Sequence, residues 1–237
     1  MVDAPGPDPS PPPSDGPAAT AADLTDAQKS LRAQMLATEH WSLLASRSTT
    51  QSEVLTRIAI FLTLVSAGLV TLGVLGNATQ FRGWFGVAAL GVLLLLALLG
   101  LITQKRAFNA SLDDLMYVVA MNRLRGAYLD LDPGLAPYFI SSADDDEAGS
   151  IRTYYAFGPR PGQILASSAM IISVVEGAVL GLFAGGVVLG LGGAIWLAIT
   201  VGVIVGVGSL VLWMVVGFRG YRDLFDRHEP LRTTSGA

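Results

Sequence analysis

Glu176 is the residue most able to carry chemistry, because it is the sole charged side chain in the fifty-five residues from Ile164 to Phe218. It lies twelve residues beyond Ile164, about 18 Å along a helix axis, which predicts a position near the middle of a bilayer. A charged carboxylate is costly there, so we expect it to be protonated or to face a polar partner or water. Ser173 lies one turn earlier, and Thr200 falls within reach in depth on the returning helix. These three residues are the intramembrane polar candidates.

Two interpretations of Glu176 follow from the sequence. In the first, the carboxylate is a proton- or ion-sensing group that lines a pore. In the second, it is a protonated, hydrogen-bonded glutamate that holds a hairpin or an oligomer together. Both stay open, because an intramembrane acid without a charged partner fits either role.

Glycines repeat at four-residue spacing close to Glu176. Small residues with this spacing allow two helix backbones to approach closely, so they mark a helix-packing surface. The sequence leaves open whether the partner helix belongs to the same chain or to a second copy. The helix-packing candidates are Gly177, Gly181 and Gly185 on one helix and Gly202 and Gly206 on the next.

Elsewhere the chain offers little that could catalyse a reaction. It has no cysteine and two histidines, His40 and His228, which removes thiolate metal sites and leaves imidazole chemistry scarce. No phosphate-binding loop, dinucleotide fingerprint or nucleophile elbow occurs. The acids from Asp144 to Glu147 lack the spaced ligands of an EF-hand, so a solvated loop is the favoured interpretation. We therefore expect no enzymatic activity, no cofactor and no metal.

The composition predicts an integral membrane protein. Of the 237 residues, 51% are hydrophobic and 14% charged, whereas a soluble domain carries about 25% charge. The net charge is −4 and there is no basic stripe, so nucleic acid is not an expected partner. Four segments are apolar on every side and long enough to cross a hydrocarbon core as helices. We predict an all-α protein with four transmembrane helices in two hairpins, at about 55–77, 83–104, 163–187 and 193–218, plus cytoplasmic helices.

Features outside these spans complete the predicted organisation. A capping box at Thr25 and Gln28 begins a helix that we expect to run into the first span, and a second helix near 108–130 should pack on it. A glycine cluster from 185 to 193 marks the expected turn of the second hairpin. The regions are a disordered, proline-rich tail at 1–22, a cytoplasmic helix at 23–54, the first hairpin at 55–104, a cytoplasmic helix and loop at 105–162, the second hairpin at 163–218 and a cytoplasmic tail at 219–237.

The distribution of basic residues predicts the orientation. Fourteen of the 15 lysines and arginines fall before the first span, between the second and third, or after the fourth, and Arg82 alone falls on the other side. By the positive-inside rule, both termini and the long central segment are cytoplasmic. We expect a multi-pass protein of the bacterial inner (plasma) membrane.

Three short stretches carry a resemblance to a known family. They are HWSLLASRSTTQSE at 40–53, MNRLRGAYLDL at 121–131 and PYF at 137–139. With them the chain resembles uncharacterised actinobacterial membrane proteins and, over roughly 38–142, is distantly similar to the SLATT membrane effectors. The resemblance implies a pore-forming role in bacterial conflict systems. Those effectors usually have two spans, whereas this chain has a second hairpin.

These observations lead to one leading expectation and two alternatives. The leading one is an oligomeric pore-forming or signal-responsive membrane effector, whose expected partners are the lipid bilayer, further copies of the chain and a cytoplasmic protein. The first alternative is a small proton- or ion-linked transporter or channel centred on Glu176. The second is a non-catalytic membrane scaffold.

Overall fold

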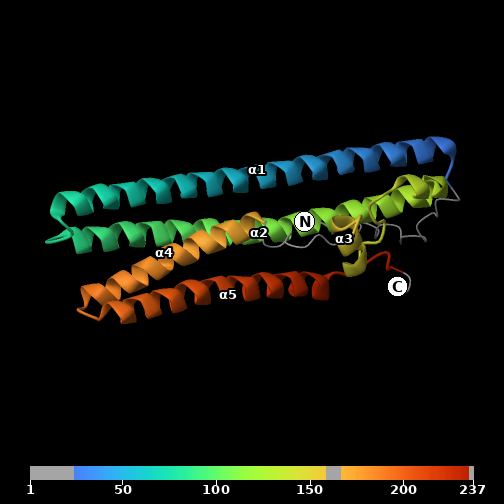
Figure 1. The fold of residues 1–237 in the computed structure, drawn as a ribbon. Coiled ribbons are helices and arrows are strands. Elements are labelled where there is room, and N and C mark those ends of the chain that lie inside the picture. Colours follow the sequence, from blue (N-terminus) through green and yellow to red (C-terminus); the bar gives the residue numbers. More distant parts are fainter. Residues whose placement is uncertain (1–23, 159–166, 235–237) are drawn as a thin grey trace, which may run out of the picture.

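The computed structural model describes residues 24–158 and 167–234, and every regular element within them is a helix (Figure 1). The predicted disordered tail at 1–22 lies outside these residues. Four helices are long and apolar enough to cross a membrane, which confirms the all-α prediction with its two helical pairs. The elements are α1 (Asp26–Thr79), α2 (Phe85–Leu131), the 3-10 helix η2 (Pro133–Tyr138), α3 (Glu147–Tyr154), α4 (Ser168–Gly190) and α5 (Ile195–Arg227).

The helices α1 and α2 are much longer than a bilayer is thick. α1 has 54 residues and α2 has 47, about 80 and 70 Å, against a hydrocarbon core of about 30 Å. The helix predicted near 108–130 is therefore the continuation of the second span. The capping box predicted at the start of α1 is present, with the backbone N–H of Gln28 donating to Thr25 Oγ1 at 3.4 Å.

The four long helices lie side by side in the order α1, α2, α4, α5 (Figure 1). α2 packs against both α1 and α4, while α5 packs mainly against α4. Both hairpin turns lie at one end of the bundle, and the start of α1 and the end of α5 point toward the other. The buried core comes from α1, α2 and α4, and α5 adds to it only Ala198 among its described residues.

The two hairpin turns use backbone conformations with positive φ. Gln80 and Phe81 adopt φ values of 51° and 56°, and the Phe81 ring occupies the space that a Cβ on Gly76 would need. In the second hairpin the turn falls at 191–194, with Gly192 at φ +82°. The glycines at 185, 186 and 190, which were predicted to form this turn, are instead part of α4. They allow close packing of α4 on its neighbours.

Candidate functional site

Glu176 lies fully buried where α4 crosses α2. Its exposed fraction is 0%, and its carboxyl group lies against Gly100 of α2, in the space that a side chain there would fill. Phe61 of α1 borders the same space, 2.8 Å from the position of a Cβ on Gly100. A single glycine on α2 therefore makes room for the carboxyl group inside the core.

Gln104 of α2 and Ser173 of α4 lie one helical turn along from Gly100 and Glu176 respectively. Gln104 is also 0% exposed, and its Nε2 donates to Ser173 Oγ at 2.9 Å. The Ser173 hydroxyl donates in turn to the carbonyl of Ala169 at 2.7 Å. The resulting α2–α4 contact is polar at Gln104 and Ser173 and is bordered by apolar side chains of the core.

Three acceptor atoms at this contact have no partner. Within the described residues, Glu176 Oε1, Glu176 Oε2 and Gln104 Oε1 accept no hydrogen bond. A buried acceptor left without a donor costs about 1–3 kcal/mol. A protonated carboxyl supplies one donor, whereas the ionised form supplies none. The surroundings therefore favour the neutral acid.

The structure does not bring Thr200 to Glu176. Gly181 faces Gly202 across the α4–α5 contact, so Thr200 lies about 10 Å from the level of Glu176 along the bundle. Thr200 is exposed and its hydroxyl donates to the carbonyl of Trp196 at 2.8 Å. The sequence-based pairing assumed a turn near 189, and the actual turn at 191–194 shifts the facing residues.

The five glycine candidates lie where α4 and α5 approach most closely. A Cβ on Gly181 would lie 2.6 Å from the carbonyl oxygen of Gly202, and a Cβ on Gly177 would lie 2.9 Å from that of Gly206. Gly185 makes the same kind of approach to Ala198. The partner of this glycine surface is therefore a helix of the same chain.

Asp114 joins three elements in the part of the bundle beyond the spans. Its carboxylate accepts two hydrogen bonds from Arg47 of α1, at 2.6 and 3.1 Å, one from Gln51 at 2.8 Å and one from Tyr154 of α3 at 2.6 Å. Burial alone would raise the pKa of Asp114, but the Arg47 and Tyr154 donors lower it overall. The ionised carboxylate thus connects α1, α2 and α3.

Asp145 corrects the interpretation of the acidic segment as a solvated loop. Its side chain is 1% exposed, and it accepts hydrogen bonds from Arg123 at 2.7 Å and from the backbone N–H groups of Leu231 and Arg232 at 3.1 and 2.7 Å. Burial would raise the pKa of Asp145, but these donors lower it overall. We call residues 228–234 the C-terminal segment. These hydrogen bonds hold it against α2 and the start of α3.

The described residues contain no group of three histidine, aspartate or glutamate side chains close enough to hold a metal ion. Sequence reasoning missed Gly100, Gln104, Asp114 and Asp145. Gln104 carried a signal, since it is the first amide after the apolar run of the second span. Comparison with family models, curated proteins and solved structures found no match to this chain.

Proposed function

We propose that this chain is a non-enzymatic, polytopic membrane protein that works as an oligomer, as a membrane effector does. It would respond to a signal at the end of the bundle opposite the two hairpin turns, which we call the charged end. The observation that carries the proposal is the apolar surface on α1 outside the membrane-spanning part. Leu31, Met35 and Trp41 are 53%, 62% and 71% exposed there. Lipid does not cover this part of α1, so a protein surface is the natural partner.

A second copy of the chain is the partner that we favour. The apolar side chains lie on a helix that already pairs with α2, and a further α1 can pack on its free side in the same manner. The contact between the α1 helices would then repeat from copy to copy around the symmetry axis of the oligomer. The two hairpins of each copy would be arranged around that axis.

The proposed orientation places both termini in the cytoplasm. Arg82 belongs to the turn between α1 and α2, and this turn lies at the same end of the bundle as the turn between α4 and α5 (Figure 1). The other described lysines and arginines lie in the stretches before, between and after the spans at the opposite end. A cysteine placed at Gly83 should react with a membrane-impermeant maleimide from outside the cell, and one placed at Thr233 should not.

The oligomer is tested by measuring mass in mild detergent or native lipid. Wild-type protein should be larger than one chain of 24.8 kDa, and Met35→Ser with Trp41→Ser should reduce it to the monomer. Thr38→Ser and Ser42→Ala change exposed polar residues on the same helix and should leave the mass unchanged. A monomeric wild type in native lipid would refute the proposal.

A second candidate function is proton or ion movement centred on Glu176. The unpartnered oxygens of Glu176 and Gln104 favour it, because buried acceptors inside a membrane bundle often belong to ion pathways. Ion flux in liposomes separates the candidates. Flux that is the same in wild type and Glu176→Gln would remove this candidate, and absence of flux in the wild type would favour a scaffold.

A further inference from the structure

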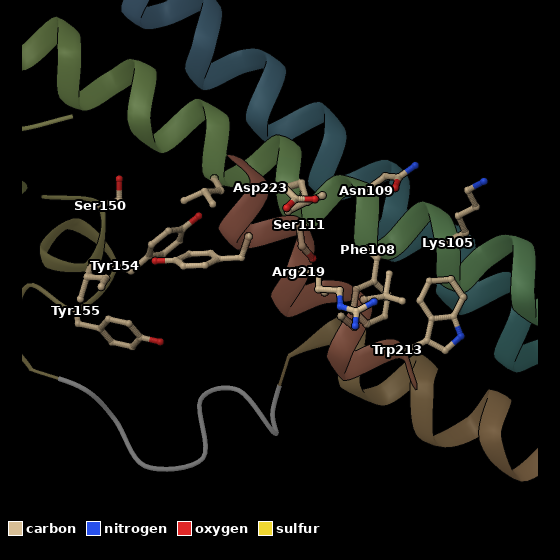
Figure 2. Close-up of a pocket in the computed structure, with 18 residues that line it drawn as sticks. Lys105, Phe108, Asn109, Ser111, Ser150, Tyr154, Tyr155, Trp213, Arg219 and Asp223 are labelled. Atoms are coloured by element: carbon tan, nitrogen blue, oxygen red, sulfur yellow. The ribbon is translucent and has the colours of Figure 1, made fainter. Parts of the chain in front are cut away.

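Two cavities between the helices differ in how they hold charge. One, of about 980 Å³, lies between α2, α3 and α5 (Figure 2). Its two cations, Lys105 and Arg219, lie on opposite sides of the stacked rings of Phe108 and Trp213, so they do not meet at one point. A smaller cavity, of about 310 Å³, lies between α1 and α2 and places one cation beside aromatic rings. It is lined by Ala37, His40 and Trp41 of α1, by Arg125 and Tyr128 of α2, and by Phe139, which follows η2.

Arg125 brings a positive charge to the smaller cavity, and no carboxylate of the described residues neutralises it. None of the ion pairs between described residues includes Arg125. Its Nη1 donates to Asn122 Oδ1 at 2.6 Å and to the carbonyl of Ser142 at 3.4 Å, and both acceptors are neutral. Nε and Nη2 carry the other N–H groups of the guanidinium, and neither atom is buried without a partner. These donors are therefore accessible to an acceptor from outside the chain.

His40 adds a second polar group to the same cavity. Its Nδ1 is buried and forms no hydrogen bond within the described residues. Burial, and after it the charge of Arg125, lowers the pKa of His40 below its ordinary value, so the ring is neutral near pH 7. Burial also lowers the pKa of Arg125, and Arg47 lowers it further, but an arginine stays ionised. The pair thus carries one positive charge, which matches a carboxylate better than a phosphate with nearly two negative charges.

Three aromatic rings form the apolar part of the cavity. The rings of Tyr128 and Phe139 have centroids 6.4 Å apart and are tilted by 56°. Trp41 of α1 supplies the third ring. Aromatic rings attract a further ring in edge-to-face or offset geometry. The volume is at the lower end of the range for ligand pockets, so the cavity suits a molecule with a single ring.

The distance from the predicted spans indicates a soluble ligand. His40 lies 15 residues before the start of the first span at about 55, which is about 22 Å along α1. Arg125 lies 21 residues beyond the end of the second span at about 104, which is about 30 Å along α2. Lipid head groups extend only about 5–8 Å beyond the hydrocarbon core. The cavity is therefore reached from water.

We propose that this cavity binds a small, soluble carboxylate that carries one aromatic ring. The carboxylate lies at Arg125 and His40. The ring lies against Trp41, Tyr128 and Phe139. The site is formed within one chain, so it depends neither on the proposed oligomer nor on ion movement.

Equilibrium dialysis of radiolabelled phenylacetate tests the ligand class. The full chain is placed in phosphatidylcholine nanodiscs, and empty nanodiscs give the background. Benzyl alcohol, which has the ring without the charge, should compete at least about tenfold less well than unlabelled phenylacetate. Acetate, which has the charge without the ring, should compete about two- to tenfold less well. Binding no greater than in empty nanodiscs, or equal competition by benzyl alcohol, would overturn the proposal. Tighter binding of phenyl phosphate would overturn the assignment of a carboxylate.

Variants of the chain then locate the ligand. Arg125→Gln should lower the affinity for phenylacetate at least about tenfold, whereas Arg32→Gln removes the same charge from an exposed position of α1 that does not line the cavity and should preserve it. Equal affinity in these two variants would overturn the proposal.

A second pair of variants keeps the test valid if Arg125→Gln fails to fold. Trp41 is 71% exposed, so Trp41→Ala leaves the core intact, and it should lower the affinity about two- to tenfold. Met35→Ala alters the proposed oligomer surface without touching the cavity and should leave the affinity unchanged. Unchanged affinity in Trp41→Ala would contradict the placement of the ring.

Discussion

Replacing Asp145 with asparagine should release the C-terminal segment from the bundle. The carboxylate accepts hydrogen bonds from the Arg123 guanidinium and from two backbone N–H groups, and it is 1% exposed. In Asp145→Asn one oxygen becomes an NH₂ group, which faces a donor and cannot accept. Hydrogen bonds to a charged group contribute about 1.5–3 kcal/mol, and Arg123 is 40% exposed and stays solvated when its partner is lost, so the undocked fraction should rise at least about tenfold.

Trypsin cleavage after Arg227 and Arg232 measures this fraction. When docking is fast compared with cleavage, the cleavage rate follows the population of the open form. Asp144→Asn is the matched control, because that side chain accepts only longer hydrogen bonds, from Ser142 at 3.3 Å and Thr234 at 3.4 Å. The control should be cleaved less than about five times faster than wild type. Equal cleavage of Asp145→Asn and wild type would refute the reasoning.

Three further predictions concern the core, the helix contact and pH. Gly100→Ala should lower the free energy of unfolding by about 1–3 kcal/mol, because the added methyl group overlaps the Glu176 carboxyl group. Glu176→Ala in the same chain should restore part of the lost melting temperature. Additive losses in the double variant would contradict this explanation. Gly181→Ala should lower the melting temperature because it forces α4 from α5, whereas Gly208→Ala, where a Cβ meets nothing within 4 Å, should not. Asp114 has a lowered pKa in the folded protein, so its contribution to stability is complete above about pH 4 and is lost as pH falls through the folded value. Melting temperatures measured from pH 6 to 2 should therefore fall less steeply in Asp114→Asn than in wild type.

The spans were predictable because a bilayer imposes one simple condition. A charge-free run of about twenty residues must satisfy its own backbone, and only a helix does so without a closed barrel. The continuation of α2 beyond the bilayer was less accessible, because Lys105 and Arg106 interrupt the apolar run without breaking the helix. Charge patterns locate the end of a span, and they do not locate the end of a helix.

The polar residues of α4 at the site were predictable from the sequence, but their partners on α2 were not. Glu176 and Ser173 stood out as polar residues in an apolar run, but their partners come from α2, at positions fixed by how α4 crosses it. Gly100 looked like an ordinary glycine of a membrane helix. Asp145 looked like one of several neighbouring acids, and only the return of the chain at 228–234 distinguishes it from Asp144.

The two hairpins contact each other both inside the spans and beyond them. Inside the spans α2 meets α4 at Gln104 and Glu176, and outside them the C-terminal segment meets Asp145. α5 packs mainly on α4, and the C-terminal segment gives the end of α5 a second connection, to Asp145 at the charged end. Asp145→Asn should therefore alter any response to a signal at that end while leaving the α4–α5 glycine contact intact.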